Sequence, residues 1–82
     1  MNIEENIRTF VIENFIIDEN PDQLENDQSF LESGIIDSTG ILELVSFIEE
    51  HYSIKIEDEE LIPDNLDSVN NVVKFINKKG NS

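Results

Sequence analysis

The stretch GIIDSTGILELVSFIEE, residues 34–50, decides the fold of this chain. Its polar first part gives way at Asp37 to apolar residues that recur every three or four positions, which is the spacing of one helix face. This spacing predicts a helix that begins at Asp37, a favoured N-cap residue, and ends at about His51. The residues expected on its buried stripe are Ile41, Leu44, Val45, Ile48 and Tyr52.

Two further segments have the same periodicity. The first predicted helix covers residues 3–17, with Asn2 as N-cap and Glu5 three residues later, as in a capping box. The last begins after a cap at Asp67 or Ser68 and ends near Lys79, where positive charge suits the helix dipole. The stripe expected on the first helix is Ile3, Ile7, Phe10 and Ile17, with Val11 at its edge. The stripe expected on the last helix is Val69, Val72, Val73 and Ile76.

The connections between these helices are unequal. Residues 18–36 form a loop that is long for a compact domain and therefore needs apolar anchors. The anchors expected are Leu24, Phe30, Leu31, Ile35 and Ile36. After the second helix comes a strand-like or irregular piece through Ile54 and Ile56, then one helical turn at Asp58 to Leu61. We expect an all-α fold, a small bundle of three main helices plus one short helix, forming one domain over residues 1–82 with an ordered core of about 2–79.

Composition restricts the functions available to the chain. Its 19 acidic and 5 basic residues give a net charge of −14. Such a charge repels phosphate backbones and anionic lipid headgroups, so we expect no nucleic acid and no membrane partner, whereas basic protein surfaces are favoured. The alternative without a specific partner is that the acidic residues only keep a small domain soluble. With no basic leader and no long apolar run, the expected location is cytoplasmic.

The pair Asp37–Ser38 lies where the second predicted helix begins. A purely structural interpretation makes Asp37 the N-cap and Ser38 the first helical residue, both common choices at that place. A helix N-terminus also stabilises negative charge, so a phosphate attached to the Ser38 hydroxyl would be favoured there. The chain has no Cys, and any thiol chemistry must therefore come from a group added to it.

Catalytic and metal sites are not expected. A nucleophilic Ser38 would need a base within hydrogen-bond reach, but His51, the only His, lies about 20 Å away along the same helix. Asp18, Asn20 and Asp22 alternate like the first ligands of a calcium loop. That loop would place Gln23 where Gly is required and Ser29 where a bidentate Glu is required.

Taken together, the residues resemble the acyl carrier proteins of the phosphopantetheine-binding family. The resemblance is carried by SFLESGIIDSTGILELVSFIEE (29–50) and continues through IKIEDEEL (54–61) and LDSVNNVVKFI (66–76). It spans nearly the whole chain. The resemblance implies a carrier that is not itself an enzyme, generally a monomer, with 4′-phosphopantetheine donated from coenzyme A and attached at Ser38.

The resemblance also implies partners. A phosphopantetheinyl transferase, using coenzyme A and Mg²⁺, would install the arm with Asp37 in a supporting role. An acyl- or aminoacyl-loading ligase and downstream transferases or synthases would then dock through basic patches. From the helical count alone, one exposed face of the second helix lies about 100° to 200° from Ile41. The partner-binding residues expected on that face are Thr39, Leu42, Glu43, Ser46 and Glu50.

The motif departs from that of typical carriers. These read Asp-Ser-Leu, and carriers of fatty-acid synthesis usually place Gly three residues before the Ser. Here Thr39 follows Ser38, Gly34 lies four residues before it, and Gly40 comes next. This G-I-I-D-S-x-G pattern resembles D-alanyl carrier proteins and stand-alone carriers served by an adenylating ligase, which favours a specialised pathway. General fatty-acid synthesis and an unmodified acidic binding module are the alternatives.

Overall fold

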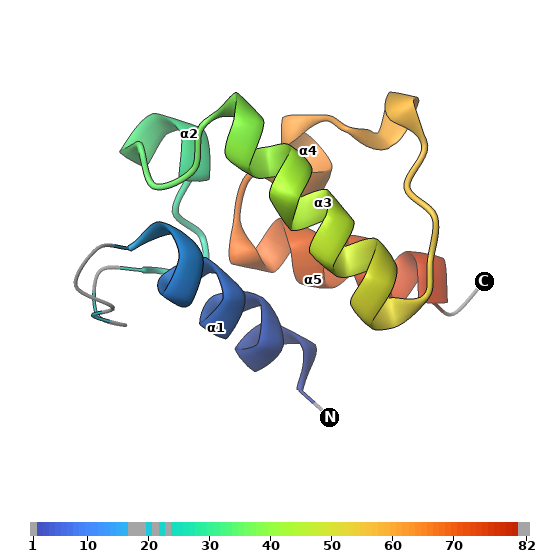
Figure 1. Ribbon diagram of the computed structural model, residues 1–82, viewed down its shortest axis with the longest axis horizontal. Helices are drawn as coiled ribbons and strands as arrows, with labels where there is room; N and C mark the ends of the chain where they lie inside the picture. Colours follow the sequence, from blue (N-terminus) through green and yellow to red (C-terminus); the bar gives the residue numbers. More distant parts are fainter. Residues whose placement is uncertain (1, 17–19, 21, 23, 81–82) are drawn as a thin grey trace.

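Helices of unequal length form the part of the chain that the structure describes. The computed structural model describes residues 2–16, 20, 22 and 24–80. The elements, in order, are α1 (Ile3–Phe15), α2 (Phe30–Ser33), α3 (Ser38–Tyr52), the 3-10 turn η2 (Asp58–Glu60), α4 (Pro63–Leu66) and α5 (Val69–Gly80). Three of them are long, and no strand occurs in the described residues. The expected all-α bundle is confirmed (Figure 1).

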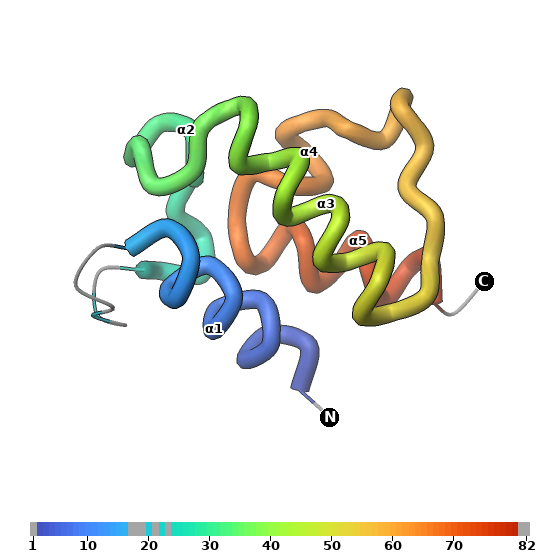
Figure 2. Tube along the Cα trace, in the orientation of Figure 1, coloured from blue at the N-terminus to red at the C-terminus, as the bar shows by residue number. Residues whose placement is uncertain are grey.

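The core lies between the three long helices. In Figure 2, α1, α3 and α5 enclose it, while α2 and α4 lie toward the end of the bundle where α3 begins. The largest fully buried side chains are Ile7, Val11, Phe30, Ile36, Leu44, Ile48, Leu66, Val69 and Val72. Every element except η2 contributes to the core, as does the connection before α3. Burial of this apolar surface is the main favourable term in folding.

Helix α1 begins after the expected N-cap Asn2, but the face that it buries is centred nearer to Val11 than predicted. The Asn2 side chain accepts a hydrogen bond from the Glu5 backbone N–H at 3.2 Å. Val11, expected at the edge of the stripe, is fully buried, whereas Phe10 is half-buried. The helix packs closely on α5 and only through longer side chains on α3, which moves its buried line toward Val11. Ile17 lies outside the described residues.

Aromatic rings connect α1 to α3. The rings of Phe10 and Phe47 are stacked with their centroids 4.3 Å apart. The imidazole of His51 also stacks on the Phe47 ring, with centroids 5.1 Å apart, and Phe15 meets Phe10 edge-on at 5.9 Å. Such pairs stabilise beyond the area they bury, by about 0.5–1.5 kcal/mol each. Large rings therefore fill the space between two helices whose backbones are not in close contact.

Gly40 makes room for two side chains, Phe15 of α1 and Ile36, at the first turn of α3. A Cβ atom at this position would lie 2.7 Å from Cγ2 of Ile36 and 2.8 Å from Cε1 of Phe15, both closer than real Cβ atoms come. Residue 40 was not expected in the buried stripe, yet it is buried because these two side chains cover it. Periodicity could not find it, since glycine carries no apolar side chain.

We expect Gly40→Ala to lower the free energy of unfolding. Overpacking costs about 1–3 kcal/mol, which exceeds the gain of up to about 1 kcal/mol that Ala brings over Gly in a helix. Urea unfolding followed by circular dichroism measures the change. Gly80→Ala is the matched control, because no atom lies within 4 Å of its added Cβ, and it should be neutral or stabilising. Equal effects at the two positions would contradict the packing argument.

The long loop is anchored, but not by all the residues expected. Leu24, Phe30 and Ile36 are buried and Ile35 is half-buried, whereas the prediction for Leu31 is wrong, because 44% of this side chain is exposed. The loop contains the four-residue helix α2, so that Phe30 faces inward and its neighbour outward. Gly34 ends α2 with φ of 77°, a left-handed conformation that glycine adopts without steric cost.

Polar contacts hold the same loop to two helices. The Arg8 guanidinium on α1 donates to the Leu24 carbonyl oxygen at 2.8 Å and to Oδ1 of Asn26 at 2.7 Å. The Asn70 backbone N–H on α5 donates to the Asn26 carbonyl oxygen at 2.9 Å. Backbone groups that would otherwise lack partners are thereby satisfied, as buried or half-buried groups must be.

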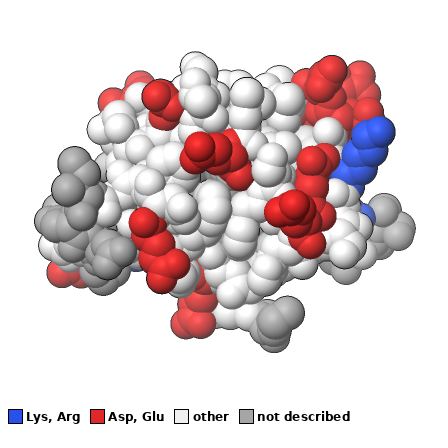
Figure 3. All heavy atoms as spheres, viewed as in Figure 1, with Lys and Arg blue, Asp and Glu red and all other residues white. Residues whose placement is uncertain are grey.

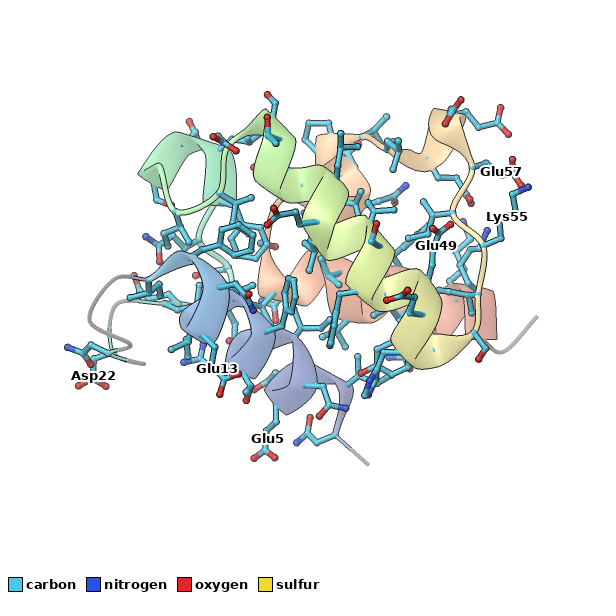
Figure 4. All side chains as sticks on the ribbon, in the orientation of Figure 1. Glu5, Glu13, Asp22, Glu49, Lys55 and Glu57 are labelled. Carbon is cyan, nitrogen blue, oxygen red and sulfur yellow. The ribbon has the colours of Figure 1, made fainter. Side chains whose placement is uncertain are left out.

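The connection after α3 is irregular, as expected, and leads to η2 and to α4, which was not expected. Ile56 is buried, and its backbone N–H donates to Glu49 Oε2 on α3 at 2.8 Å. Glu49 faces this connection, whereas Lys55 and Glu57 point outward (Figure 4). Pro63, taken as a break, occupies the first turn of α4, a position that proline favours.

The last helix is α5. Its buried stripe includes Phe75, which was not among the residues expected there, whereas Val73, which was expected there, is only half-buried. Near its end, the Lys79 ammonium donates a hydrogen bond to Oε1 of Glu60 in η2 at 2.8 Å. This hydrogen bond, together with one from the Glu57 backbone N–H, lowers the pKa of Glu60 below its ordinary value of 4.5. The contribution to stability is therefore present above the unfolded-chain pKa and is lost as the pH falls through the folded one.

Candidate functional site

The candidate site is the first turn of α3, where Asp37 and Ser38 lie. Asp37 is the N-cap, and its side-chain oxygen accepts a hydrogen bond from the Gly40 backbone N–H at 2.7 Å. Ser38 is the first helical residue, and its side chain is exposed. The positive end of the α3 dipole therefore faces the solvent beside an accessible hydroxyl. This position fits a phosphodiester, whose negative charge is stabilised at a helix N-terminus.

The expected partner face of α3 is exposed throughout. Leu42 stands out, because 57% of this apolar side chain is accessible. The other residues expected on the face are also exposed, namely Thr39, Glu43, Ser46 and Glu50. The opposite side of the helix is buried through Leu44, Val45 and Ile48. The helical count therefore separated the accessible side from the packed one, while the function of the accessible side stays a prediction.

A groove of about 240 Å³ lies beside Ser38. Its lining is mainly apolar and comes from α2, α3, α4 and the segment before α4. The lining residues are Leu31, Ser38, Ile41, Leu42, Leu61, Ile62, Pro63, Leu66 and Asp67. Sequence reasoning named Ser38 and Leu42 as site residues but not their neighbours from α2 and α4. No periodic signal could bring α2 and α4 together, since the whole of α3 lies between them in the chain.

Asp67, one of the residues that line this groove, connects it to the start of α2 through hydrogen bonds. Its carboxylate accepts a hydrogen bond from the Ser29 hydroxyl and another from the Leu31 backbone N–H at 3.1 Å. Its carbonyl oxygen accepts from the Phe30 backbone N–H at 2.7 Å. The start of α2 is therefore bonded to the connection between α4 and α5. We expected Asp67 only as a possible cap of the last helix, but Ser68 fills that role by accepting from the Asn71 backbone N–H.

No basic residue lines the groove, and one acidic residue, Asp67, does. In Figure 3, acidic atoms are spread over the visible face, and the basic atoms gather at its right edge. No Lys or Arg occurs between Arg8 and Lys55, or between Lys55 and Lys74. Both ranges together contain every residue that lines the groove. A partner with a positive surface would therefore be attracted to this end of the molecule.

In the residues that the structure describes, no group of three or more His, Cys, Asp or Glu side chains is placed to hold a metal ion. Of the residues that alternate like calcium ligands, Asp18 lies outside the described ranges. Asn20 Oδ1 accepts a hydrogen bond from the Asp22 backbone N–H at 3.0 Å. None of the described helices has both the length and the apolar character needed to cross a bilayer.

Comparisons with known proteins agree with this geometry. Residues 16–76 match the family model described as a phosphopantetheine attachment site. An acyl carrier protein of Buchnera aphidicola is 35% identical over 78 residues, covering 95% of this chain and 92% of the relative. One from Bdellovibrio bacteriovorus is 31% identical over 80 residues, covering 98% and 97%. One from Wolinella succinogenes is 33% identical over 76 residues, covering 93% and 95%.

The fold is a small helical bundle with an accessible serine at a helix start, and these sequences match it over most of its length. Together, the fold and the matches identify a carrier protein. The chain belongs to the acyl carrier protein family. Its prosthetic group is a covalently attached phosphopantetheine. Carrier proteins of this kind interact with phosphopantetheinyl transferases and with biosynthetic enzymes.

Proposed function

We propose that Ser38 bears the 4′-phosphopantetheine and that the protein carries acyl or aminoacyl groups on it as thioesters. The observation that carries this proposal is the exposed Ser38 side chain at the first residue of α3. Ser38 lies within the matched residues 16–76. The arm supplies the thiol that a chain without Cys lacks. The protein itself needs no catalytic group, because partner enzymes load and unload it. The location that we propose is the cytoplasm.

The attachment reaction defines the task of each residue. The Ser38 Oγ attacks the pantetheine-side phosphorus of coenzyme A, and a new O–P bond forms. The bond from this phosphorus to the bridging oxygen breaks, 3′,5′-ADP leaves, and the hydroxyl proton passes to a base of the transferase or to water. Asp37 holds the helix start in place through its bond to the Gly40 N–H. Its negative charge beside Ser38 also suits a role near the transferase metal.

The cargo that we propose is an amino acid or an unusual acyl group of a specialised pathway. This rests on the resemblance of the G-I-I-D-S-x-G pattern to D-alanyl and stand-alone carriers. Gly40 of that pattern has a structural reason, because Phe15 and Ile36 pack against it. Thr39 presents less apolar surface than the Leu of typical carriers. General fatty-acid synthesis is the second candidate, since the relatives quoted above are named simply acyl carrier proteins.

Mass spectrometry tests the attachment. Incubating the protein with a promiscuous phosphopantetheinyl transferase, Mg²⁺ and coenzyme A should add the mass of one phosphopantetheine group. Digestion should then place the added mass on the peptide that contains Ser38. An unchanged mass would contradict the carrier proposal and favour an unmodified acidic module that only binds partners.

The cargo is tested on protein purified from its own cells without reducing agents that cleave thioesters. The mass above that of the holo-protein should correspond to an amino acid or an unusual acyl group. A series of masses that differ by two-carbon units would instead indicate fatty-acid synthesis. The neighbouring genes give a second readout, because an adenylating ligase supports the specialised pathway and ketosynthases support the other.

A further inference from the structure

The side chains that attack thioesters are unevenly placed in this chain. Amines, thiols and imidazoles are effective nucleophiles toward a thioester carbonyl, whereas hydroxyls are weak ones unless a base activates them. The sequence has no Cys, and its side chains of the other two kinds are His51, Lys55, Lys74, Lys78 and Lys79. All five follow Glu50 in the sequence, in the last turn of α3 or beyond it, whereas Ser38 is the first residue of that helix.

Helix α3 is a rigid spacer between Ser38 and the first of these groups. Its 15 residues span roughly 22 Å, because an α-helix rises 1.5 Å per residue. His51 lies in the last turn, where its imidazole stacks on the Phe47 ring with centroids 5.1 Å apart. The imidazole is therefore separated from Ser38 by almost the whole length of the helix.

Lys55 lies in the connection that follows α3. The Ile56 backbone N–H donates to Glu49 Oε2 at 2.8 Å, which keeps this connection beside the last turns of α3. Lys55 is exposed, and its side chain points outward from the bundle (Figure 4). This lysine therefore also lies near the end of α3, far from the first turn.

The lysines of α5 point away from the core or are engaged in a bond. By helical count, Lys74 lies opposite the buried stripe of α5, and Lys78 follows one turn later on the same exposed side. Lys79 donates to Oε1 of Glu60 at 2.8 Å, so its nitrogen is occupied. Helices α3 and α5 both run toward the right-hand side of Figure 1, and Lys78 and Lys79 therefore lie toward the end opposite to Ser38.

The length of the arm gives this placement a chemical meaning. The main chain of 4′-phosphopantetheine has about fourteen atoms, as many as about five residues, so it extends to roughly 17 Å. An amine well within that radius would meet the thioester at an effective concentration in the millimolar range, whereas one near or beyond the limit is met rarely. Full extension of the arm toward one point also costs conformational entropy.

We infer that the carrier protects its cargo from its own side chains by this placement of nucleophiles. The reaction that it avoids is acyl transfer from sulfur to nitrogen. A neutral lysine Nζ attacks the thioester carbonyl carbon, a C–N bond forms, the C–S bond breaks, and a proton from the nitrogen passes to the departing thiolate. The cargo would then remain on the protein as an amide. This inference rests on the proposed attachment at Ser38 and on the thioester that the arm carries.

An added lysine tests the inference. Ser46 is exposed on α3, about 12 Å from Ser38 along the helix axis and so within reach of the arm. A promiscuous transferase loads each protein from acetyl-coenzyme A, the excess reagent is removed, and the protein is incubated at about pH 8.5, where more of the lysine is neutral. Hydroxylamine then cleaves acetyl thioesters but not acetyl amides. Ser46→Lys should form hydroxylamine-resistant acetyl-protein roughly tenfold faster than the wild type, as measured by intact mass.

Two matched variants control for charge and for the mere number of lysines. Ser46→Arg adds the same charge without a nucleophilic amine and should behave like the wild type. Asn77→Lys adds the same amine on the exposed side of α5, in its last turns, and should also behave like the wild type. Peptide mapping of Ser46→Lys should place the resistant acetyl group on the substituted position.

The outcomes separate this inference from the proposed function. If the wild-type protein gains no mass on loading, the attachment at Ser38 is wrong. Normal loading, followed by resistant acetylation of a wild-type lysine as fast as in Ser46→Lys, would overturn the protection alone. Equal rates for Ser46→Lys and Asn77→Lys would overturn it as well, because the position of the amine would then make no difference.

Discussion

Replacing Ser38 by Ala should abolish attachment of the phosphopantetheine arm. The oxygen that becomes part of the phosphodiester is absent from the variant, so the loss is complete and does not depend on enzyme concentration. The fold should persist, because Ala is accepted at the first position of a helix and the Asp37 cap is unchanged. Intact mass after overnight incubation with transferase and coenzyme A measures the result.

Ser46→Ala is the matched control for this experiment. Ser46 lies on the same helix, about two turns further on, and is likewise exposed. This variant should gain the mass of one phosphopantetheine group as the wild type does. Modification of Ser38→Ala, or failure of Ser46→Ala to be modified, would show that the arm is attached at another hydroxyl.

Replacing Phe30 by Ala should remove most of the stability of the protein. The Phe30 side chain is fully buried where α2 meets the core, so truncation creates a cavity and costs about 3–5 kcal/mol. A domain of this size rarely has more than about 3–5 kcal/mol of net stability. We therefore expect a largely unfolded variant at 25 °C. Urea titrations followed by far-ultraviolet circular dichroism, with wild type alongside, give the free energies of unfolding.

The neighbouring residue supplies the control. Leu31→Ala truncates a side chain on the same short helix that is 44% exposed, and it should change the free energy of unfolding by no more than about 0.5 kcal/mol. Neither substitution removes a backbone N–H group that bonds to Asp67 in the folded protein, so the comparison isolates the side chains. A difference between the two variants of less than about 1 kcal/mol would contradict the assigned burial of Phe30.

The long helices could be predicted from the sequence because they contain several turns of apolar spacing and recognisable caps. The N-caps Asn2 and Asp37 were identified in advance, and both accept the expected backbone N–H. Ser38 could be placed at a helix start for the same reason. The family resemblance then added the chemistry of the arm, which no residue of the chain could specify alone.

The short helices and the groove could not be predicted in this way. Helices α2 and α4 have four residues each, about one turn, so no periodicity can be measured in them. For that reason Leu31 was expected to be buried, and Pro63 to be a break. The role of Asp67 depends on contacts with Ser29 and Leu31, 38 and 36 residues away, which only the folded chain brings together.

The bonds from Asp67 to α2 have a consequence for the order of folding. A single helical turn is not stable in isolation, so α2 persists only when its N–H groups have found Asp67 and its phenylalanine has entered the core. Contacts between residues so distant in sequence form late, because closing the chain between them costs entropy first. A newly made chain therefore completes the surroundings of Ser38 only after its C-terminal third has folded, and maturation of the carrier should follow folding rather than precede it.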